Sequence, residues 1–214
     1  MIHDLINFKG YKSILCLNCE LPPIDFFAKH QLPIIAADGA ANSLYALGLH
    51  PAIIVGDLDS VDSSLLAKYP FLHLPDQNSN DYQKTLAYLQ ENQLLPSIVV
   101  GINGGYLDHI LNNINIFMST DCLLYAPPLH GWGLNSGSEI DLILPKDSKI
   151  SLIGIPHAVI SSQGLKWELS KNTLSFPGSN SCYNRTVLPK ITLEVHEGKL
   201  LILVYENPMP DAGQ

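Results

Sequence analysis

The chain has 214 residues, of which 46% are hydrophobic and 15% are charged, with a formal net charge of −8. This composition excludes an intrinsically disordered chain and supplies enough apolar material for one large domain or two small ones. The 12 Lys and Arg residues are scattered, so no basic patch predicts nucleic-acid binding. No run of 18 apolar residues predicts a membrane span, and the first residues lack the features of a signal peptide, so we expect a cytoplasmic protein.

Strand and helix patterns alternate through the first half of the chain. Short apolar runs predict strands at residues 13–17, 33–37, 53–55, 71–74, 97–100 and 122–125. Amphipathic stretches predict helices at residues 24–30, 40–47, 63–68, 81–89 and 107–117. Because strands joined by helices make right-handed crossovers, we expect a Rossmann-like α/β domain with a mostly parallel sheet at residues 1–130.

The pattern changes near Pro127 and Pro128, after which the sequence carries no convincing helix signal. Alternating runs predict strands at residues 140–144, 149–153, 164–169, 191–195 and 200–205, and turn residues separate them at 145–147, 170–172, 177–178 and 197–198. We therefore expect a C-terminal all-β domain at residues 131–214, a sandwich with a barrel as the alternative.

Four cysteines bear on the redox and metal chemistry of the chain. Cys16 and Cys19 form a C-x-x-C pair, but neither Cys122 nor Cys182 belongs to a second pair that would complete a zinc site. Because Cys16 lies in an apolar run, we favour unpaired structural cysteines, with a redox pair as the alternative.

Two carboxylates, Asp57 and Asp59, follow the buried strand predicted at residues 53–55. Ligands of open α/β sheets bind just past the carboxyl ends of the strands. Two Asp residues separated by one position repel each other unless a cation is present, so the pair predicts a Mg²⁺ site. The alternative is an ordinary turn, where Asp and Ser are common.

Three further polar clusters follow other predicted strands. Asp38, Gly39 and Asn42 lie at a junction from strand to helix whose free amides suit an anion, although plain helix capping explains them as well. Asp81 and Lys84 are three residues apart and share one face of a helix, where Lys84 can pair with a carboxylate or contact a phosphate.

The fourth cluster, residues 101–109, begins with glycines that let the backbone approach a phosphate. Asp108 and His109 follow in the first helical turn. Asp108 is alternatively a favourable charge near a helix N-terminus, and His109 a capping or core-edge histidine. No Walker A loop occurs in the chain.

The four clusters, in this order, resemble the thiamin pyrophosphokinase family. The matching residues are Asp38-Gly39-Ala40-x-Asn42, Gly56-Asp57-Leu58-Asp59-Ser60, Asp76-Gln77-x-x-x-Asp81-x-x-Lys84 and Gly104-Gly105-x-x-Asp108-His109. The second half adds Ser161-x-x-Gly164-Leu165-Lys166-Trp167 and Ser179-Asn180, so the resemblance covers nearly the whole chain. One departure is Tyr106, which stands where the family usually has Arg. A tyrosine can hydrogen-bond a phosphate but cannot neutralise it.

The resemblance implies an α/β catalytic domain followed by a β-sandwich, in a homodimer with its sites at the subunit interface. It implies that thiamin binds where the sheet domain of one subunit meets the catalytic domain of the other. The implied reaction transfers the pyrophosphoryl group of ATP to the hydroxyl of thiamin with Mg²⁺ and releases AMP. The substrate's own alcohol is then the nucleophile, so catalysis is mostly positioning and charge neutralisation.

The resemblance also implies roles for individual residues. The catalytic group comprises Asp57, Asp59, Asp81 and Lys84, with the three carboxylates as Mg²⁺ ligands and Asp81 also as a candidate base. The ATP-binding group comprises Asp38, Gly39, Asn42, Gln77, Gly104, Gly105 and His109. The thiamin-binding group comprises Gln77, Asp81, Asp108, Ser161, Trp167, Ser179 and Asn180. Trp167 is the residue expected to stack on the cationic substrate; without the resemblance it would be interpreted as a core tryptophan.

Two alternative functions stay open. One is another Mg²⁺-dependent nucleotide phosphotransferase or hydrolase, which would use the same carboxylates on a different acceptor. The other is a non-catalytic thiamin-binding sensor on the same fold.

Overall fold

The computed structural model describes residues 10–206. The chain divides into two compact units, one ending at Ala126 and the other continuing from Pro127. Each unit is described by itself below.

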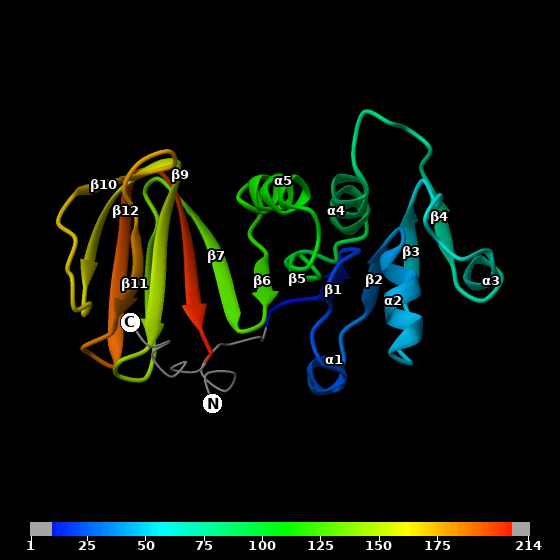
Figure 1. Cartoon of the computed structure of the whole chain (residues 1–214), viewed down its shortest axis with the longest axis horizontal. Coiled ribbons are helices and arrows are strands. Elements are labelled where there is room, and N and C mark those ends of the chain that lie inside the picture. The colour runs from blue at the N-terminus through cyan, green and yellow to red at the C-terminus, as the bar shows by residue number, and fades with distance from the viewer. Residues whose placement is uncertain (1–9, 207–214) are drawn as a thin grey trace. The chain divides into compact units, whose positions relative to one another are not determined.

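The first unit is a parallel sheet whose strands alternate with helices (Figure 1). Its strands are β1 (Ser13–Cys16), β2 (Ile34–Ala37), β3 (Ile53–Gly56), β4 (Phe71–His73), β5 (Ser97–Val100) and β6 (Leu123–Ala126). Its helices are α1 (Ile24–His30), α2 (Ala40–Ala46), α3 (Ser63–Leu66), α4 (Asp81–Glu91) and α5 (Leu107–Phe117). The strands lie in the order β6-β5-β1-β2-β3-β4, and all of these neighbours are parallel.

The central strands of this sheet are buried on both faces. Ile14 and Leu15 of β1 and Ile98 and Val99 of β5 are fully buried, as the continuous apolar runs of the sequence predict for parallel strands. Burying a side chain of this size contributes about 1.5–3 kcal/mol, so the runs themselves specify the middle of the sheet.

The strand order reverses beside β1, which lies between β5 and β2. The chain leaves β1 toward β2 on one side, whereas it leaves β5 toward β6 on the other. Connections that diverge in this way open a crevice at the carboxyl ends of the two strands, where ligands of such sheets bind. The topology therefore places the ligand site at the segments that follow β1, β2, β3 and β5.

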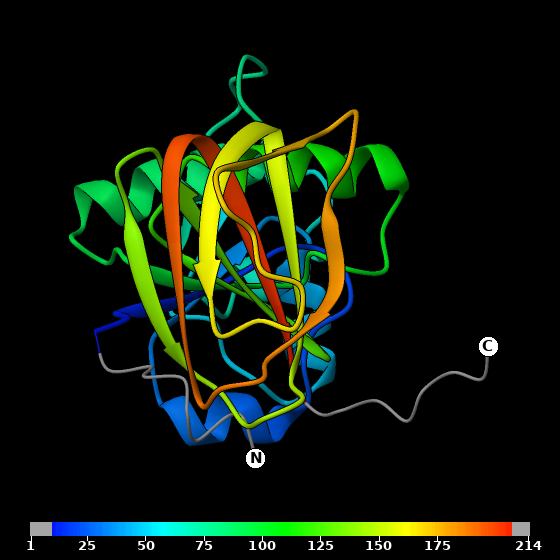
Figure 2. The same ribbon diagram turned by 90° about the vertical axis from the view of Figure 1, so that its left-hand side faces the viewer.

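The second unit is antiparallel, and no helix occurs between residues 127 and 206. Its strands are β7 (Leu129–Asn135), β8 (Glu139–Ile143), β9 (Lys149–Gln163), β10 (Asn172–Ser175), β11 (Ser181–Arg185) and β12 (Lys190–Tyr205). β12 pairs with β7, β8 and β9, and Figure 2 shows β9 and β12 as long, strongly bent strands. Side chains such as Ile150, Leu193 and Ile202 form the buried core between them.

Several predicted elements of this half are wrong, and β-bulges explain one of them. The turn predicted at residues 197–198 lies inside β12, where the register against β9 shifts between Val195 and Glu197 and again between Gly198 and Leu200. A bulge bends a strand without ending it, and Gly198 takes the left-handed φ of +77° that the bend requires. The strands predicted at 191–195 and 200–205 are thus one strand, with the left-handed glycine at its bend.

The other differences concern short segments. Residues 164–169, predicted as a strand, form a loop, whereas β7, β10 and β11 were not predicted. The arrangement of these strands as a sandwich stays a prediction. Among the described helices, none is long and apolar enough to cross a membrane.

Candidate active site

A cleft of about 390 Å³ opens at the carboxyl ends of the parallel strands. The segments after β1, β2 and β3 line it together with residues of α4 and α5. Five of the residues predicted from the sequence line it: Asp38, Asp57, Asp59, Asp81 and His109. A larger hollow of about 670 Å³ beside α4 and α5 contains none of the predicted residues.

The backbone around the cleft brings carboxylates of distant segments together. Gly56 ends β3, and a Cβ at this position would lie 2.8 Å from Cβ of Asp38 and 3.0 Å from Oδ1 of Asp81. Asn80 begins α4 with a capping box, in which its side chain accepts from the backbone N–H of Gln83 and the Gln83 side chain accepts in return. The absent side chain and the fixed helix start together place Asp81 beside Asp38.

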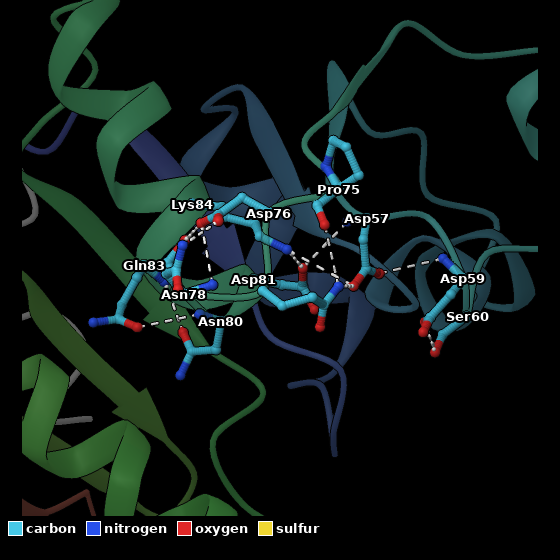
Figure 3. A network of polar contacts seen from close by, with 12 residues as sticks. Asp57, Asp59, Ser60, Pro75, Asp76, Asn78, Asn80, Asp81, Gln83 and Lys84 are labelled. Atoms are coloured by element: carbon cyan, nitrogen blue, oxygen red, sulfur yellow. Dashed lines mark hydrogen bonds and ion pairs between the residues drawn. The ribbon is translucent and has the colours of Figure 1, made fainter.

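Three carboxylates form a cluster at this point. Single ligand oxygens of Asp38, Asp57 and Asp81 all lie within 4.8 Å of one another. Figure 3 shows Asp57 and Asp81 close together, whereas Asp59 lies to one side with Ser60. Oδ1 of Asp59 accepts a hydrogen bond of 2.8 Å from the Ser60 hydroxyl. The cluster therefore contains Asp38, and Asp59 lines the same cleft outside it.

Lys84 supplies the positive charge nearest to this cluster. Its Nζ lies 3.3 Å from Oδ1 of Asp81 and 3.8 Å from Oδ2 of Asp57, and the side chain is almost completely buried. Gln77 donates a hydrogen bond of 3.1 Å from Nε2 to Oδ2 of Asp57. This bond, assisted by the charge of Lys84, lowers the pKa of Asp57 and keeps it ionised.

Asp38 is the most deeply buried carboxylate of the cluster. It is 5% exposed, and its Oδ1 is buried without a hydrogen-bond partner among the described residues. Burial, together with the charges of Asp81, Asp57 and Asp59, raises the pKa of Asp38. Among the described residues, Lys84 pairs with two of the three carboxylates, Asp57 and Asp81, which leaves excess negative charge in the cluster. A hard divalent cation with oxygen ligands fits this donor set in charge and chemistry.

The residues predicted on the nucleotide side form two groups around the cleft. Asn42 joins neighbouring segments, because its Nδ2 donates to the carbonyl of Ser60 and its Oδ1 accepts from the N–H of Asp62. This bridge holds the loop that carries Asp57 and Asp59 against α2. Asn42 is thereby a support of the site wall.

The glycine-rich segment after β5 packs closely on the segment after β1. A Cβ on Gly104, whose φ is +88°, would lie 2.9 Å from Cβ of Glu20, and one on Gly105 would lie 2.6 Å from Sγ of Cys19. Asp108 is exposed at the start of α5 and accepts from the backbone N–H of His109. Tyr106 is 79% exposed, with its ring 6.0 Å from that of His109.

The predicted thiamin residues of the second unit occupy different environments. Trp167 is 55% exposed, so the interpretation as a core tryptophan does not hold. The amide of Asn180 binds backbone groups only, accepting from Gly154 N–H and donating to the carbonyl of Ser175. The Ser161 hydroxyl lies 2.8 Å from Nε2 of His196, and Ser179 is exposed.

Sequence reasoning missed residues that line the cleft beside the predicted ones. Asn18 and Cys19 follow β1, and Asn112 and Asn113 lie on α5 three and four residues after His109. The rule that ligand-binding residues follow the carboxyl ends of parallel strands would also have predicted Asn18, because it follows β1. The α5 pair follows from helical spacing, which places residues three and four apart on one face.

Comparisons with known proteins find thiamin pyrophosphokinases. Residues 25–124 match the family model described as thiamin pyrophosphokinase, catalytic domain. The chain is 28% identical to thiamine pyrophosphokinase 1 of Arabidopsis thaliana, over 85% of this chain and 82% of the relative. It is 29% identical to thiamine pyrophosphokinase 3 of Oryza sativa subsp. japonica, over 80% of this chain and 78% of the relative.

Solved structures share the fold. The thiamine pyrophosphokinase of Bacillus subtilis matches with a TM-score of 0.76 at 19% identity, covering 92% of this chain and 100% of that chain. The thiamin pyrophosphokinase of Candida albicans matches with a TM-score of 0.77 at 17% identity, covering 91% of this chain and 89% of that chain. The resemblance of the sequence motifs is confirmed: the matching family model, the similar curated relatives and the similar solved structures are all thiamin pyrophosphokinases.

Proposed function

We propose that the chain is a thiamine diphosphokinase, which transfers the pyrophosphoryl group of ATP to the hydroxyl of thiamin. The observation that carries this proposal is the partly buried carboxylate cluster of Asp38, Asp57 and Asp81 beside Lys84, at the strand ends where ligands of this fold bind. The cluster lies within the segment that matches the catalytic domain of the family.

In the proposed reaction the hydroxyl oxygen of thiamin forms a bond to the β-phosphorus of ATP. The bond from that phosphorus to the oxygen bridging to the α-phosphate breaks, and AMP leaves. Asp81, at the first position of α4, orients the hydroxyl and accepts its proton. Lys84 keeps two of the carboxylates ordered and partly neutralised, so that negative phosphates can approach.

We propose Mg²⁺ as the cofactor, held by Asp57 and Asp81 with Asp38 as the third ligand. Bound there, Mg²⁺ would neutralise charge on the phosphates of ATP. The sequence had predicted Asp59 as a ligand; its exposed carboxylate, bonded to Ser60, suits a contact farther from the ion. Gln77 holds the Asp57 carboxylate through its hydrogen bond and, in this proposal, also contacts substrate.

The nucleotide is proposed to lie against the segments after β2 and β5. Gly39, Gly104 and Gly105 let the phosphates approach the backbone, with Asn42 supporting the wall and His109 at the α5 side. Tyr106 is an exposed hydroxyl where the family usually has Arg. It can donate a hydrogen bond to the nucleotide without neutralising its charge.

Thiamin recognition is proposed to use the second unit, as a β-sandwich, together with Asp108. Trp167 offers an exposed aromatic face for the cationic ring. Polar contacts to thiamin are proposed for Ser161, Ser179 and Asn180. We propose a homodimer as the active form and a cytoplasmic location. Size-exclusion chromatography with light scattering tests the dimer.

An acceptor screen tests this function against its nearest competitor. Purified protein is incubated with ATP and Mg²⁺, and AMP is measured with thiamin, with other primary alcohols and with water alone. We expect release that depends on thiamin and stops with chelator. Release that is equal without thiamin would favour a nucleotide hydrolase. Thiamin binding without any AMP would favour the sensor.

The variant Asp57→Asn is the control for the site. It removes one carboxylate at the end of β3 while keeping the side-chain volume, so folding should be retained and turnover lost. Activity equal to wild type in this variant would contradict the metal assignment.

A further inference from the structure

The loop between β9 and β10 holds a tryptophan out in solvent. Trp167 is 55% exposed, whereas Leu165, two residues before it, is 2% exposed and belongs to the core of the second unit. An exposed Trp gains little stability from burial, and a surface loop is ordinarily mobile. The hydrogen bonds of the loop backbone around Trp167 therefore determine whether the loop can hold the indole ring in one orientation.

The side chain of Asn184 holds the backbone of Trp167 through two hydrogen bonds. Its Oδ1 accepts from the N–H of Trp167 at 3.2 Å, and its Nδ2 donates to the carbonyl of Trp167 at 2.8 Å. Its Oδ1 also accepts from the N–H of Arg185, and its Nδ2 donates to the hydroxyl of Ser181. The side chain is 1% exposed and all four of its hydrogen-bonding positions are used.

A bulge in β11 turns Asn184 inward. Ser181 pairs with Leu152 and Asn184 pairs with Ile150. Three residue steps along β11 therefore correspond to two residue steps along β9. Tyr183, just before Asn184, takes a positive φ of 56° and stays exposed. Bulges of this kind re-aim side chains and are frequent beside functional sites.

Glu168 closes the same loop from its other end. Its Oε1 accepts from the backbone N–H groups of Gly164 and Leu165, and its Oε2 accepts from the Ser162 hydroxyl at 2.5 Å. The backbone N–H of Lys166 is bonded to the carbonyl of Arg185. The backbone on both sides of Trp167 is thus fixed, and its indole projects from this fixed loop with more than half of the residue exposed.

The indole face already interacts with a cation. Nζ of Lys166 lies 4.7 Å from the centre of the Trp167 ring. This contact shows that the ring accepts a positive group over its face, which is the chemistry a cationic aromatic substrate would use.

We propose that Asn184 is a positioning residue that holds Trp167 as a preformed stacking face for the cationic ring of thiamin. The proposal rests on the proposed function. Asn184 does not touch the substrate and acts through the two hydrogen bonds to Trp167. A preformed face avoids the loss of side-chain and loop freedom on binding, which is worth about a three- to ten-fold change in affinity.

The first test measures steady-state kinetics of Asn184→Ala. We expect KM for thiamin to rise about three- to ten-fold, with KM for ATP and kcat within two-fold of wild type. Asn184→Asp keeps the acceptor for the Trp167 N–H but loses the donor to its carbonyl, so its KM should lie between the two. Thr186→Val is the matched control, because Thr186 is buried in the same region but its hydroxyl bonds the carbonyl of Pro145 and the N–H of Ser148 and not the backbone of Trp167. KM for thiamin unchanged in folded Asn184→Ala, or raised equally in Thr186→Val, would overturn the proposal.

The second test reads the orientation of the indole without any turnover. The chain has two tryptophans, so Trp132→Phe leaves Trp167 as the only one. We expect time-resolved fluorescence anisotropy to show little local motion of Trp167, and Asn184→Ala to add a fast component. A fast component already present with Asn184 in place would overturn the positioning role, even if thiamin diphosphate is formed. If the protein formed no thiamin diphosphate, the anisotropy would still decide the role of Asn184, and the proposed function alone would fail.

Discussion

Replacing Gly56 by Ala tests whether the spacing of the carboxylates is what makes the site. Gly56 ends β3 between two of the cluster's residues, and it has no positive φ that an alanine would strain. The added methyl would lie 2.8 Å from Cβ of Asp38 and 3.0 Å from Oδ1 of Asp81. The effect of the substitution therefore comes from the lack of space alone.

The size of the effect follows from these distances. Ordinary van der Waals contact begins at 3.4 Å, so Asp38 must move by about 0.6 Å and the Asp81 carboxylate by about 0.4 Å. Misplacement of a catalytic group by about 1 Å can cost about a hundred-fold in rate, so we expect kcat/KM to fall about ten- to a hundred-fold. Overpacking costs about 1–3 kcal/mol of unfolding free energy.

The assay is AMP release with ATP, thiamin and Mg²⁺, run beside a urea unfolding curve. Gly48→Ala is the matched control in the same unit, because Gly48 has a φ of +72° and nothing within 4 Å of an added Cβ. A left-handed alanine should cost about 1 kcal/mol of stability while leaving activity intact. Wild-type activity in Gly56→Ala, at a comparable loss of stability, would refute the argument that the cluster's spacing controls catalysis.

Three further predictions concern the ligands, the helix start and the thiols. Asp38→Asn should lower activity about a hundred-fold or more and Asp59→Asn less than ten-fold; equal losses in an AMP assay would contradict the choice of Asp38 as a ligand. In chelator, Asp38→Asn should also melt at a higher temperature than wild type, because burial raises the pKa of this carboxyl and the variant removes the buried charge. Asn80→Ala removes the capping box of α4 and should cost about 1 kcal/mol in urea unfolding; an unfolding midpoint equal to wild type would contradict the role of this cap. Under native conditions at pH 8, mass spectrometry should find Cys182 alkylated first, because it is exposed whereas burial raises the pKa of Cys16 and of Cys122; rapid labelling of Cys16 would contradict its placement in β1.

The secondary structure of the first half of the chain was predictable because apolar runs and amphipathic stretches alternate clearly in its sequence. Apolar runs such as residues 97–100 can only be buried strands when helical stretches separate them, and α1, α5 and β5 have the predicted bounds. The carboxyl ends of such strands meet at one edge, so Asp38, Asp57 and Asp81 were all expected there. The four cysteines are free, as predicted, and Cys16 is fully buried.

The secondary structure of the second half was harder to predict, because the residue types that mark a β-bulge in a sequence also mark a turn. Gly198 follows a charged residue between two alternating runs, which is also the pattern of a hairpin turn. Only the pairing of β12 with β9 on both sides of Gly198 distinguishes the two. Likewise, the backbone of Trp167 is hydrogen-bonded to the side chain of Asn184, which is 17 residues away in sequence, so the environment of Trp167 could not be predicted from its neighbours.

The members of the carboxylate cluster could be predicted only in part. Asp57 and Asp59 are two residues apart in sequence, but the path of the chain after β3 turns Asp59 toward Ser60. Asp38 joins the cluster across the sheet, from the end of β2 to the end of β3, as the parallel pairing of these strands allows. Spacing along the chain carries no information about which of Asp57 and Asp59 joins the cluster.

The central claim is that the cluster of Asp38, Asp57 and Asp81 supports transfer of a pyrophosphoryl group to thiamin. The measurement that tests it most directly is the ratio of AMP to thiamin diphosphate formed from ATP and thiamin with Mg²⁺. The account predicts one AMP for each thiamin diphosphate, and neither product with chelator. Formation of ADP with thiamin monophosphate, or no phosphorylated thiamin at all, would contradict it.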